Sequence, residues 1–227
     1  VTWAAISNHA ALVVIDVPAQ KVLRSIPVGR YPFGITLSPD GTKAYIANVG
    51  IYEYAYFRDE KGEIAKLPFP PFGVPSPEAE SGLVMDGIRI PGLGDPNDIR
   101  GMSVWTVDIS EKGKEKVIAK TKTGHLVGEQ LEDFPAVGGS SPNSIAATEK
   151  FVYVSNGSND SISIIDARNG KRLKDIDLTL HPRVARWRGM IPFGVALSPN
   201  KSFLYVAEAG INAVAVIRLR DHKVLGH

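Results

Sequence analysis

Five histidines are the side chains of this sequence best suited to metal binding or acid–base chemistry, and they are dispersed. They form no His-Glu-x-x-His motif and no close pair, so a zinc site built from neighbouring positions is not supported. They are His9, His125, His181, His222 and His227. Because His125 and His181 stand in two connections that could meet in space, we keep both as candidate ligand-binding residues.

Other chemical motifs are equally weak. The sequence has no cysteine, which excludes disulfides, thiolate metal sites, iron–sulfur clusters and haem attached through a Cys-x-x-Cys-His motif. Asp95-Pro96-Asn97-Asp98 offers oxygen ligands for Ca²⁺, but Arg100 takes the glycine position of an EF-hand loop, which favours an Asx-rich turn. Gly92-Leu93-Gly94 lacks the third glycine of a dinucleotide site, and no nucleophile elbow or Walker motif occurs. We expect no catalytic residue, no metal and no cofactor in this chain.

Two stretches are candidates for recognising a ligand or partner. Tyr52, Tyr54 and Tyr56 alternate near the start of residues 51–102, and they either stack on carbohydrate or peptide or pack on the scaffold, of which packing is the simpler. The second stretch, 180–190, places His181, Arg183, Arg186 and Trp187 before Arg188. An arginine trio could bind a phosphate or carboxylate bidentately. The simpler interpretation is pairing with acidic loops, because residues 51–102 carry nine acidic and five basic residues, a net −4.

The elements that position these residues are strands, and the sequence repeats them. Residues 32–48, 142–156 and 192–208 share a pattern in which an apolar stretch precedes a β-branched and aromatic one. Between residues 140 and 180, four such segments of about five residues alternate with polar turns, which predicts a four-stranded antiparallel meander. No segment has a helical apolar period over 11 or more residues, so the predicted fold class is all-β.

Strand-ending aspartates are a regular part of this pattern. Asp16 and Asp166 follow two apolar residues, Asp108 follows Thr106 and Val107, and all three precede a polar turn; Arg218 replaces the aspartate in the last unit. An aspartate at a strand end accepts backbone N–H bonds in an Asx turn, so we predict a structural role for them.

The repeated unit resembles a known family. Tyr45-Ile46-Ala47-Asn48, Tyr153-Val154-Ser155-Asn156 and Tyr205-Val206-Ala207-Glu208 are similar to the Tyr-Val-Thr-Asn motif of the YVTN family of β-propeller repeats. The resemblance covers nearly the whole chain outside three insertions. It implies a β-propeller, and it implies a secreted, periplasmic or cell-surface location. Some members carry their propeller in front of a phosphoesterase domain, and the 68–72 and 92–97 stretches look similar to the insert of those bifunctional members.

The repeats predict about three and a half to four blades, which makes a partial propeller. We expect a partial blade at residues 1–31, a blade at 32–124 with a long insertion at 51–102, and blades at 140–180 and 192–227. Propellers usually close with four to eight blades, and the first unit lacks its innermost strand. The chain begins at Val1, so it is either processed or a piece of something longer. Another copy or missing blades would close the ring.

Strand parity predicts where the insertions lie. In a four-stranded meander, the turns after the second and fourth strands share one face, and the 51–102, 125–139 and 180–190 loops all occupy such positions. Loops grafted on one side of a rigid scaffold commonly carry function, although they could equally cover an apolar surface.

Composition and topology together favour a non-enzymatic binding or scaffold propeller. Its loop face would engage a protein, a glycan or a neighbouring domain. A net charge of +2 gives no electrostatic reason to expect nucleic acid, and no apolar run approaches the roughly 18 residues of a membrane helix. The alternative is the propeller portion of a larger exported enzyme, such as a metal-dependent phosphoesterase, with its catalytic residues outside this chain.

Overall fold

The computed structural model describes residues 2–6, 10–52, 72–85 and 87–227. Within them the main strands form four antiparallel sheets, each assembled in chain order. The first sheet has three strands: β1 (Thr2–Ile6), β2 (Ala11–Asp16) and β3 (Lys21–Pro27). The second has four: β4 (Pro32–Leu37), β5 (Lys43–Asn48), β8 (Ser103–Asp108) and β9 (Lys116–Lys122).

The third and fourth sheets repeat the four-stranded arrangement. The third contains β12 (Pro142–Ala147), β13 (Phe151–Asn156), β14 (Ser161–Asp166) and β15 (Arg172–Asp177). The fourth contains β16 (Pro192–Leu197), β17 (Phe203–Glu208), β18 (Ala213–Arg218) and β19 (Lys223–Gly226). The predicted all-β class of four-stranded antiparallel sheets is therefore confirmed.

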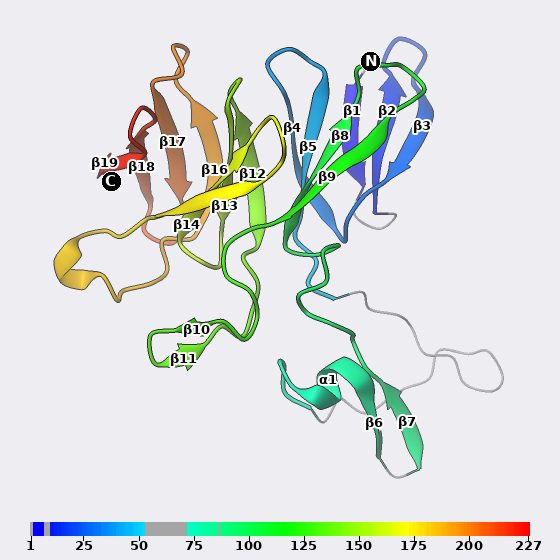
Figure 1. Cartoon of the computed structure of the whole chain (residues 1–227), viewed down its shortest axis with the longest axis vertical. Helices are drawn as coiled ribbons and strands as arrows, with labels where there is room; N and C mark the ends of the chain where they lie inside the picture. Colours follow the sequence, from blue (N-terminus) through cyan, green and yellow to red (C-terminus); the bar gives the residue numbers. More distant parts are fainter. Residues whose placement is uncertain (1, 7–9, 53–71, 86) are drawn as a thin grey trace.

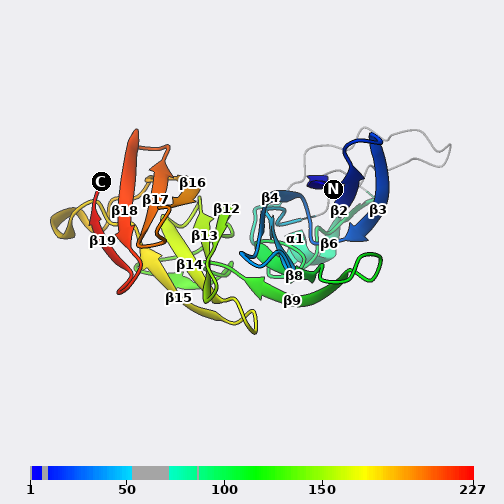
Figure 2. The same cartoon turned by 90° about the horizontal axis from the view of Figure 1, so that it is seen from above.

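The sheets follow one another along a curved row, with the two chain ends far apart (Figures 1 and 2). The first strands of successive sheets contact each other, β4 with β12 and β12 with β16. Among the described residues, the first and fourth sheets do not meet to close a ring.

The core lies between successive sheets. Tyr45 of the second sheet is buried against Val152 and Val154 of the third, and Tyr153 of the third is buried against Leu204 and Val206 of the fourth. The second strand of a sheet is apolar on both faces because neighbouring sheets cover both. This is why β13 reads Phe-Val-Tyr-Val instead of alternating with polar residues.

Close approach of the inner strands depends on small residues. A Cβ atom on Gly34 of β4 would lie 2.1 Å from the Asn143 carbonyl oxygen of β12, so only glycine fits there. Ser144, at the corresponding position of β12, instead accepts a hydrogen bond from the Val195 backbone N–H of β16 at 3.2 Å. The serine hydroxyl therefore replaces a glycine contact with a polar link to the next sheet.

Short turns connect strands on one side of the sheets, which we call the turn side (upper in Figure 1). Asp16 accepts the Ala19 N–H, Asp108 the Ser110 N–H, and Asp166 the Arg168 N–H, at 2.8–3.2 Å. The predicted Asx turns are therefore present. Each aspartate bonds to residues only two or three positions away.

Long connections gather on the opposite side, which we call the loop side (lower in Figure 1). The connection from β5 to β8 contains a short helix, α1 (Pro77–Ser81), and a hairpin, β6 (Gly82–Met85) with β7 (Ile88–Pro91). A second hairpin, β10 (Gln130–Leu131) with β11 (Phe134–Pro135), follows β9, and a 3-10 turn, η2 (Pro182–Val184), follows β15. The predicted parity of the three insertions is confirmed. The helix and the β6–β7 hairpin are not foreseen by the repeat pattern.

Ser76 explains why α1 begins where it does. Its hydroxyl accepts a hydrogen bond from the Ala79 N–H at 3.0 Å, and Pro77 occupies the first helical turn. No helix in the described part of the chain is long and apolar enough to cross a bilayer.

Candidate functional site

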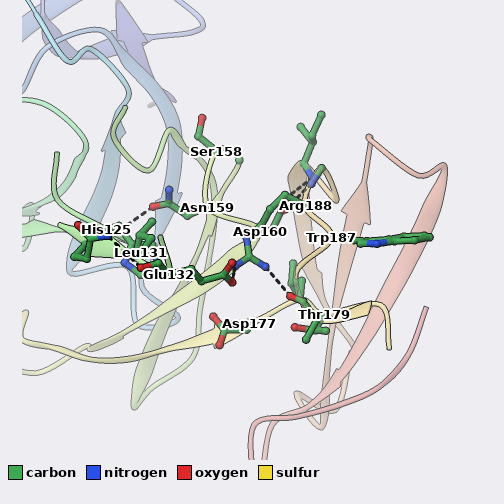
Figure 3. Close-up of a pocket in the computed structure, with 16 residues that line it drawn as sticks. His125, Leu131, Glu132, Ser158, Asn159, Asp160, Asp177, Thr179, Trp187 and Arg188 are labelled. Atoms are coloured by element: carbon green, nitrogen blue, oxygen red, sulfur yellow. Dashed lines mark hydrogen bonds and ion pairs between the residues drawn. The ribbon is translucent and has the colours of Figure 1, made fainter. Parts of the chain in front are cut away.

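A cleft of about 890 Å³ opens on the loop side of the third sheet (Figure 3). One wall comes from the connection after β9, which includes β10, and the other from the loop 178–191. The floor is formed by the 157–160 turn between β13 and β14 and by the end of β15. The polar side chains that line it are His125, Gln130, Glu132, Ser158, Asn159, Asp160, Asp177, Thr179 and Arg188.

His125 is fixed by the turn that follows β9. Its backbone N–H donates to the Asn159 side-chain oxygen at 2.8 Å, and its Nδ1 lies 3.1 Å from Glu129 Oε1. The Leu126 N–H and the His125 ring hold the pKa of Glu129 below its usual range. Gly124 has a φ of 54° and admits no side chain, because a Cβ would lie 2.2 Å from the Asn159 oxygen. The histidine wall is therefore anchored to the floor.

Asp160 fastens the opposite wall to the same floor. Its carboxylate accepts hydrogen bonds from the Gly189 N–H at 2.6 Å and the Ile191 N–H at 2.9 Å. The Asp160 carbonyl also accepts the Leu178 N–H at 2.9 Å. One residue thus holds both ends of the loop 178–191 in place.

An ion pair joins the two walls. Arg188 donates through one terminal nitrogen to Glu132 Oε1 at 2.8 Å and through the other to the Ala185 carbonyl at 2.8 Å. Both side chains are more than 40% exposed, so the pair itself adds little stability. Its effect is geometric, since it sets the separation of the walls.

The chemistry left open in the cleft is mainly acidic and polar. Glu132 is paired with Arg188 and Asp160 is occupied by backbone N–H groups, whereas Asp177 makes no hydrogen bond or ion pair with a described side chain. Within the described residues, no three histidine or carboxylate side chains are grouped to hold a metal ion.

Trp187 adds an exposed aromatic surface at the margin of the cleft. It is 66% exposed, and in Figure 3 its ring lies on the side away from His125. A tryptophan in this position offers a large apolar face next to polar groups, which suits an amphipathic ligand.

The long insertion is tied to the same side. Asn97 donates to the Val127 carbonyl and accepts from the Val127 N–H, both at 2.9 Å. The buried Arg30 donates to the Ile51 carbonyl at 2.7 Å and pairs with Asp98 at 3.3 Å. The bond from Arg100, reinforced by Arg30, lowers the pKa of Asp98 to about 2. The three insertions therefore form a linked series, from Asn97 through Val127 to Arg188.

The structure brings some predicted residues together and separates others. His125 and Trp187 line the cleft, as does Arg188, which pairs with an acidic loop in the predicted way. His181 does not line it, because its Nδ1 caps η2 by accepting the Arg183 N–H at 3.1 Å. Arg183 and Arg186 are exposed outside the cleft and make no ion pair with a described residue.

The tyrosines require a correction. Tyr52 is 2% exposed, so it packs within the protein instead of presenting a recognition surface, as the packing alternative proposed. Tyr54 and Tyr56, and most of the 68–72 segment, lie outside the described residues.

Sequence reasoning missed Asp160 and Asp177, which shape the floor of the cleft. Asp160 has a φ of 46°, and the corresponding position before β18 is Asn212 with a φ of 54°. Aspartate and asparagine tolerate this left-handed backbone, so the turn itself accounts for the residue type. Only the position of the loop 178–191 in the structure shows that the Asp160 carboxylate also binds this loop.

Comparisons with known proteins bear on the fold. No protein-family model and no curated protein matches this sequence. A solved structure of Kuenenia stuttgartiensis hydrazine synthase is similar with a TM-score of 0.57 and 17% identity, over 98% of this chain and 44% of that chain. The structure of U3-55K is similar with a TM-score of 0.54 and 8% identity, over 98% of this chain and 46% of that chain.

Both structures are β-propeller-like, and at these identities the likeness concerns the fold alone. This chain spans less than half the length of either. The comparisons and the coordinates agree on an all-β arrangement of successive four-stranded antiparallel sheets.

Proposed function

We propose that this chain is a non-enzymatic binding module, built as part of a YVTN-type β-propeller, that recognises a glycan in its loop-side cleft. The observation that carries this proposal is the combination of an 890 Å³ cleft with the exposed Trp187 at its margin. A sugar presents apolar C–H faces and hydroxyl edges. Such a ligand needs an aromatic face beside donors and acceptors, which the cleft provides.

The polar groups of the cleft fit this class of ligand. Asp177 offers acceptors that no described side chain occupies, and Ser158, Asn159 and Thr179 add neutral groups nearby. Residues from three separate connections converge there, so the ligand would contact a surface that no single loop provides. The family resemblance further suggests an exported protein.

Calorimetric titration with neutral oligosaccharides of hexoses and N-acetylhexosamines tests the proposal. Trp187→Ala should abolish measurable binding, and Asp177→Asn should weaken it. Phe134→Ala is the matched control, because Phe134 is an aromatic of the same side that is 75% exposed and does not line the cleft. Failure of every saccharide to bind, or equal binding by Trp187→Ala, would rule out the proposed ligand class.

The propeller part of the proposal rests on an uncovered sheet face. Tyr45 and Tyr153 are 2% and 1% exposed because the next sheet covers them, whereas Tyr205 at the same position of the fourth sheet is 40% exposed. Val214 on that face is 50% exposed, while its counterparts Val104 and Ile162 are 1% and 0% exposed. A face built like two covered ones is suited to a further sheet of the same type.

Sedimentation velocity tests what covers the exposed face of the fourth sheet. A second copy covering the face would appear as a dimer that Val214→Asp dissociates, and a stable monomer would favour further sheets of a longer polypeptide. A monomer whose solubility is unchanged when Tyr205 and Val214 are both made polar would contradict the need for any covering sheet.

The second candidate is the propeller portion of a larger exported enzyme. The chain covers only 44% of the hydrazine synthase chain and 46% of the U3-55K chain. In that case a longer polypeptide would show hydrolysis of a phosphoester with added divalent metal, and the present residues alone would show none.

A further inference from the structure

A second cleft, of about 610 Å³, lies on the turn side between the third and fourth sheets, away from the loop-side cleft. Two of its walls are formed by the turn that precedes β13 and the turn that precedes β17. The residues that follow β18 form the third. Nothing in the loop-side proposal uses these residues.

The equivalent junction between the second and third sheets is almost filled. There Lys43, the first residue of β5, donates from Nζ to the Ala167 carbonyl at 2.6 Å, and the remaining volume is about 100 Å³. At the next junction, Phe151 takes the place of Lys43. Its ring packs edge-on against His222 at 5.5 Å, and the cleft at this junction measures about 610 Å³. The junction between the third and fourth sheets therefore keeps an open cleft, whereas the equivalent space between the second and third sheets is almost filled.

The open cleft is strongly basic. Its lining includes four basic side chains and one acidic side chain, a sum of +3: Lys150, Lys201, Arg218, Arg220 and Glu149. Lys201 pairs with Glu149, and Arg218 is held by both oxygens of Asp221 at 2.7–3.1 Å. Lys150 and Arg220 make no ion pair with any residue in the described ranges.

Among the neighbouring titratable groups, Asp221 offsets one positive charge through its ion pair with Arg218, and the charge of Arg220 also acts on it. Burial raises the pKa of the Tyr153 phenol to about 12, so the phenol stays neutral. Burial and the nearby Lys174 lower the pKa of His222, so its ring is neutral as well, and it lies 3.3 Å from the Tyr153 hydroxyl. The cleft thus combines Lys150 and Arg220, which form no ion pair within the described residues, with an apolar wall of Phe151 and Phe203.

We propose that this turn-side cleft binds a small organic oxyanion. Its phosphate or carboxylate group pairs with Lys150 and Arg220, and its apolar body lies against Phe151 and Phe203. Arg220 supplies the planar donor fork that suits both kinds of anion, and Lys150 supplies a point charge. The recognition is separate from glycan binding, so either site can exist without the other.

Phenyl phosphate, benzoate and benzyl alcohol are matched probes, since they share a ring and differ in the anionic group. Two-dimensional amide NMR should show shifts in residues 148–153 and 218–222 with the anions and none with the alcohol. A stronger response to phenyl phosphate than to benzoate identifies a phosphate ester as the natural ligand class, and the reverse identifies a carboxylate.

The variants assign the site. Removing one exposed cation, as in Arg220→Ala, should weaken binding about fivefold, and Lys150→Ala combined with Arg220→Ala should weaken it about twentyfold. Arg220→Lys should restore most of the affinity. Lys112→Ala is the control, because it removes the same charge from an exposed turn on the same side outside the cleft.

Three results would overturn the inference. They are equal affinity for benzyl alcohol and the anions, unchanged affinity in the double variant, and anion-induced shifts confined to residues 181–188 on the loop side. Circular dichroism of each variant verifies that the sheets remain folded.

Discussion

Aspartates form hydrogen bonds on both sides of this molecule, but two of those on the loop side reach over much longer sequence distances than those on the turn side. On the turn side, Asp108 and Asp166 bond to the N–H groups of Ser110 and Arg168, two positions away. On the loop side, Asp160 bonds to Gly189 and Ile191, 29 and 31 positions away, and Asp98 pairs with Arg30 at a separation of 68.

The difference teaches where the molecule can adapt. A local Asx turn forms together with the two strands that it connects, so it cannot open while those strands stay paired. A long-range bond orders a loop whose closure carries its own entropic cost, so losing the bond releases the loop without unfolding the sheets. We expect glycan binding to use the loop side, because its shape depends on such bonds.

The largest expected effect is at Asp160. Asp160→Gly removes two charge-assisted hydrogen bonds, and glycine tolerates the φ of 46°, so the loss should be about 2 kcal/mol of unfolding free energy. Hydrogen exchange should accelerate at Gly189 and Ile191, while the β13 and β14 amides stay protected. Asn212→Gly changes the matching turn of the fourth sheet and should leave both amides unaffected. Unaltered exchange in Asp160→Gly would remove the distinction between the two sides.

Acid should weaken the loop side through Asp98. Its pKa is about 2 when folded against an ordinary value of 3.8, so its contribution is complete above about pH 4 and disappears as the pH falls toward about 2. The loss should be about 1–2 kcal/mol in urea unfolding between pH 5 and pH 2.5. Asp98→Asn should show a smaller loss over this range. An identical pH dependence in the variant and the parent would contradict the assigned role.

A turn-side change should cost less and stay local. Ser38 accepts the Lys43 N–H at 2.9 Å and donates to Asp40 Oδ1 at 2.6 Å, so Ser38→Ala should cost about 1 kcal/mol. Exchange should accelerate only in residues 38–43. Faster exchange on the loop side of the second sheet would show that the two sides are coupled.

The smallest effect is expected at the exposed ion pair that joins the cleft walls. A double-mutant cycle of Glu132→Gln and Arg188→Gln should give a coupling energy of about 0.5 kcal/mol, decreasing with added salt. Saccharide affinity should nevertheless fall, because the walls lose their fixed separation. A large coupling energy that does not change with salt concentration would mean that the ion pair stabilises the fold and does not merely hold the walls at a fixed separation.

Much of the scaffold could be predicted because it repeats. The second strand of each four-stranded sheet has a tyrosine at the same position: Tyr45, Tyr153 and Tyr205. Comparing these copies predicts where the strands lie, the order in which they pair and the side on which the short turns lie. The parity of the insertions follows from strand order alone. The missing first strand of the first sheet is visible in the same way.

The loop side could be predicted only in outline, because its contacts occur once. Nothing in the sequence around Asp160 distinguishes it from Asn212, yet only Asp160 meets the returning loop. Tyr52 is 2% exposed although no repeat marks its position as buried, and α1 is too short to show a helical period. A contact between two non-repeating segments leaves no periodic signal in either.

The glycine at position 34 carries a consequence for symmetry. Where Gly34 meets Asn143, the inner edges of two sheets come within backbone contact, whereas at the next junction the Ser144 hydroxyl accepts a hydrogen bond from the Val195 N–H. Wedges that are thinner at the hub turn through a larger angle per step. In the proposed ring, the contacts between the innermost strands therefore set the angle between successive blades and, with it, the number of blades. A larger residue at position 34 would favour a ring with more blades.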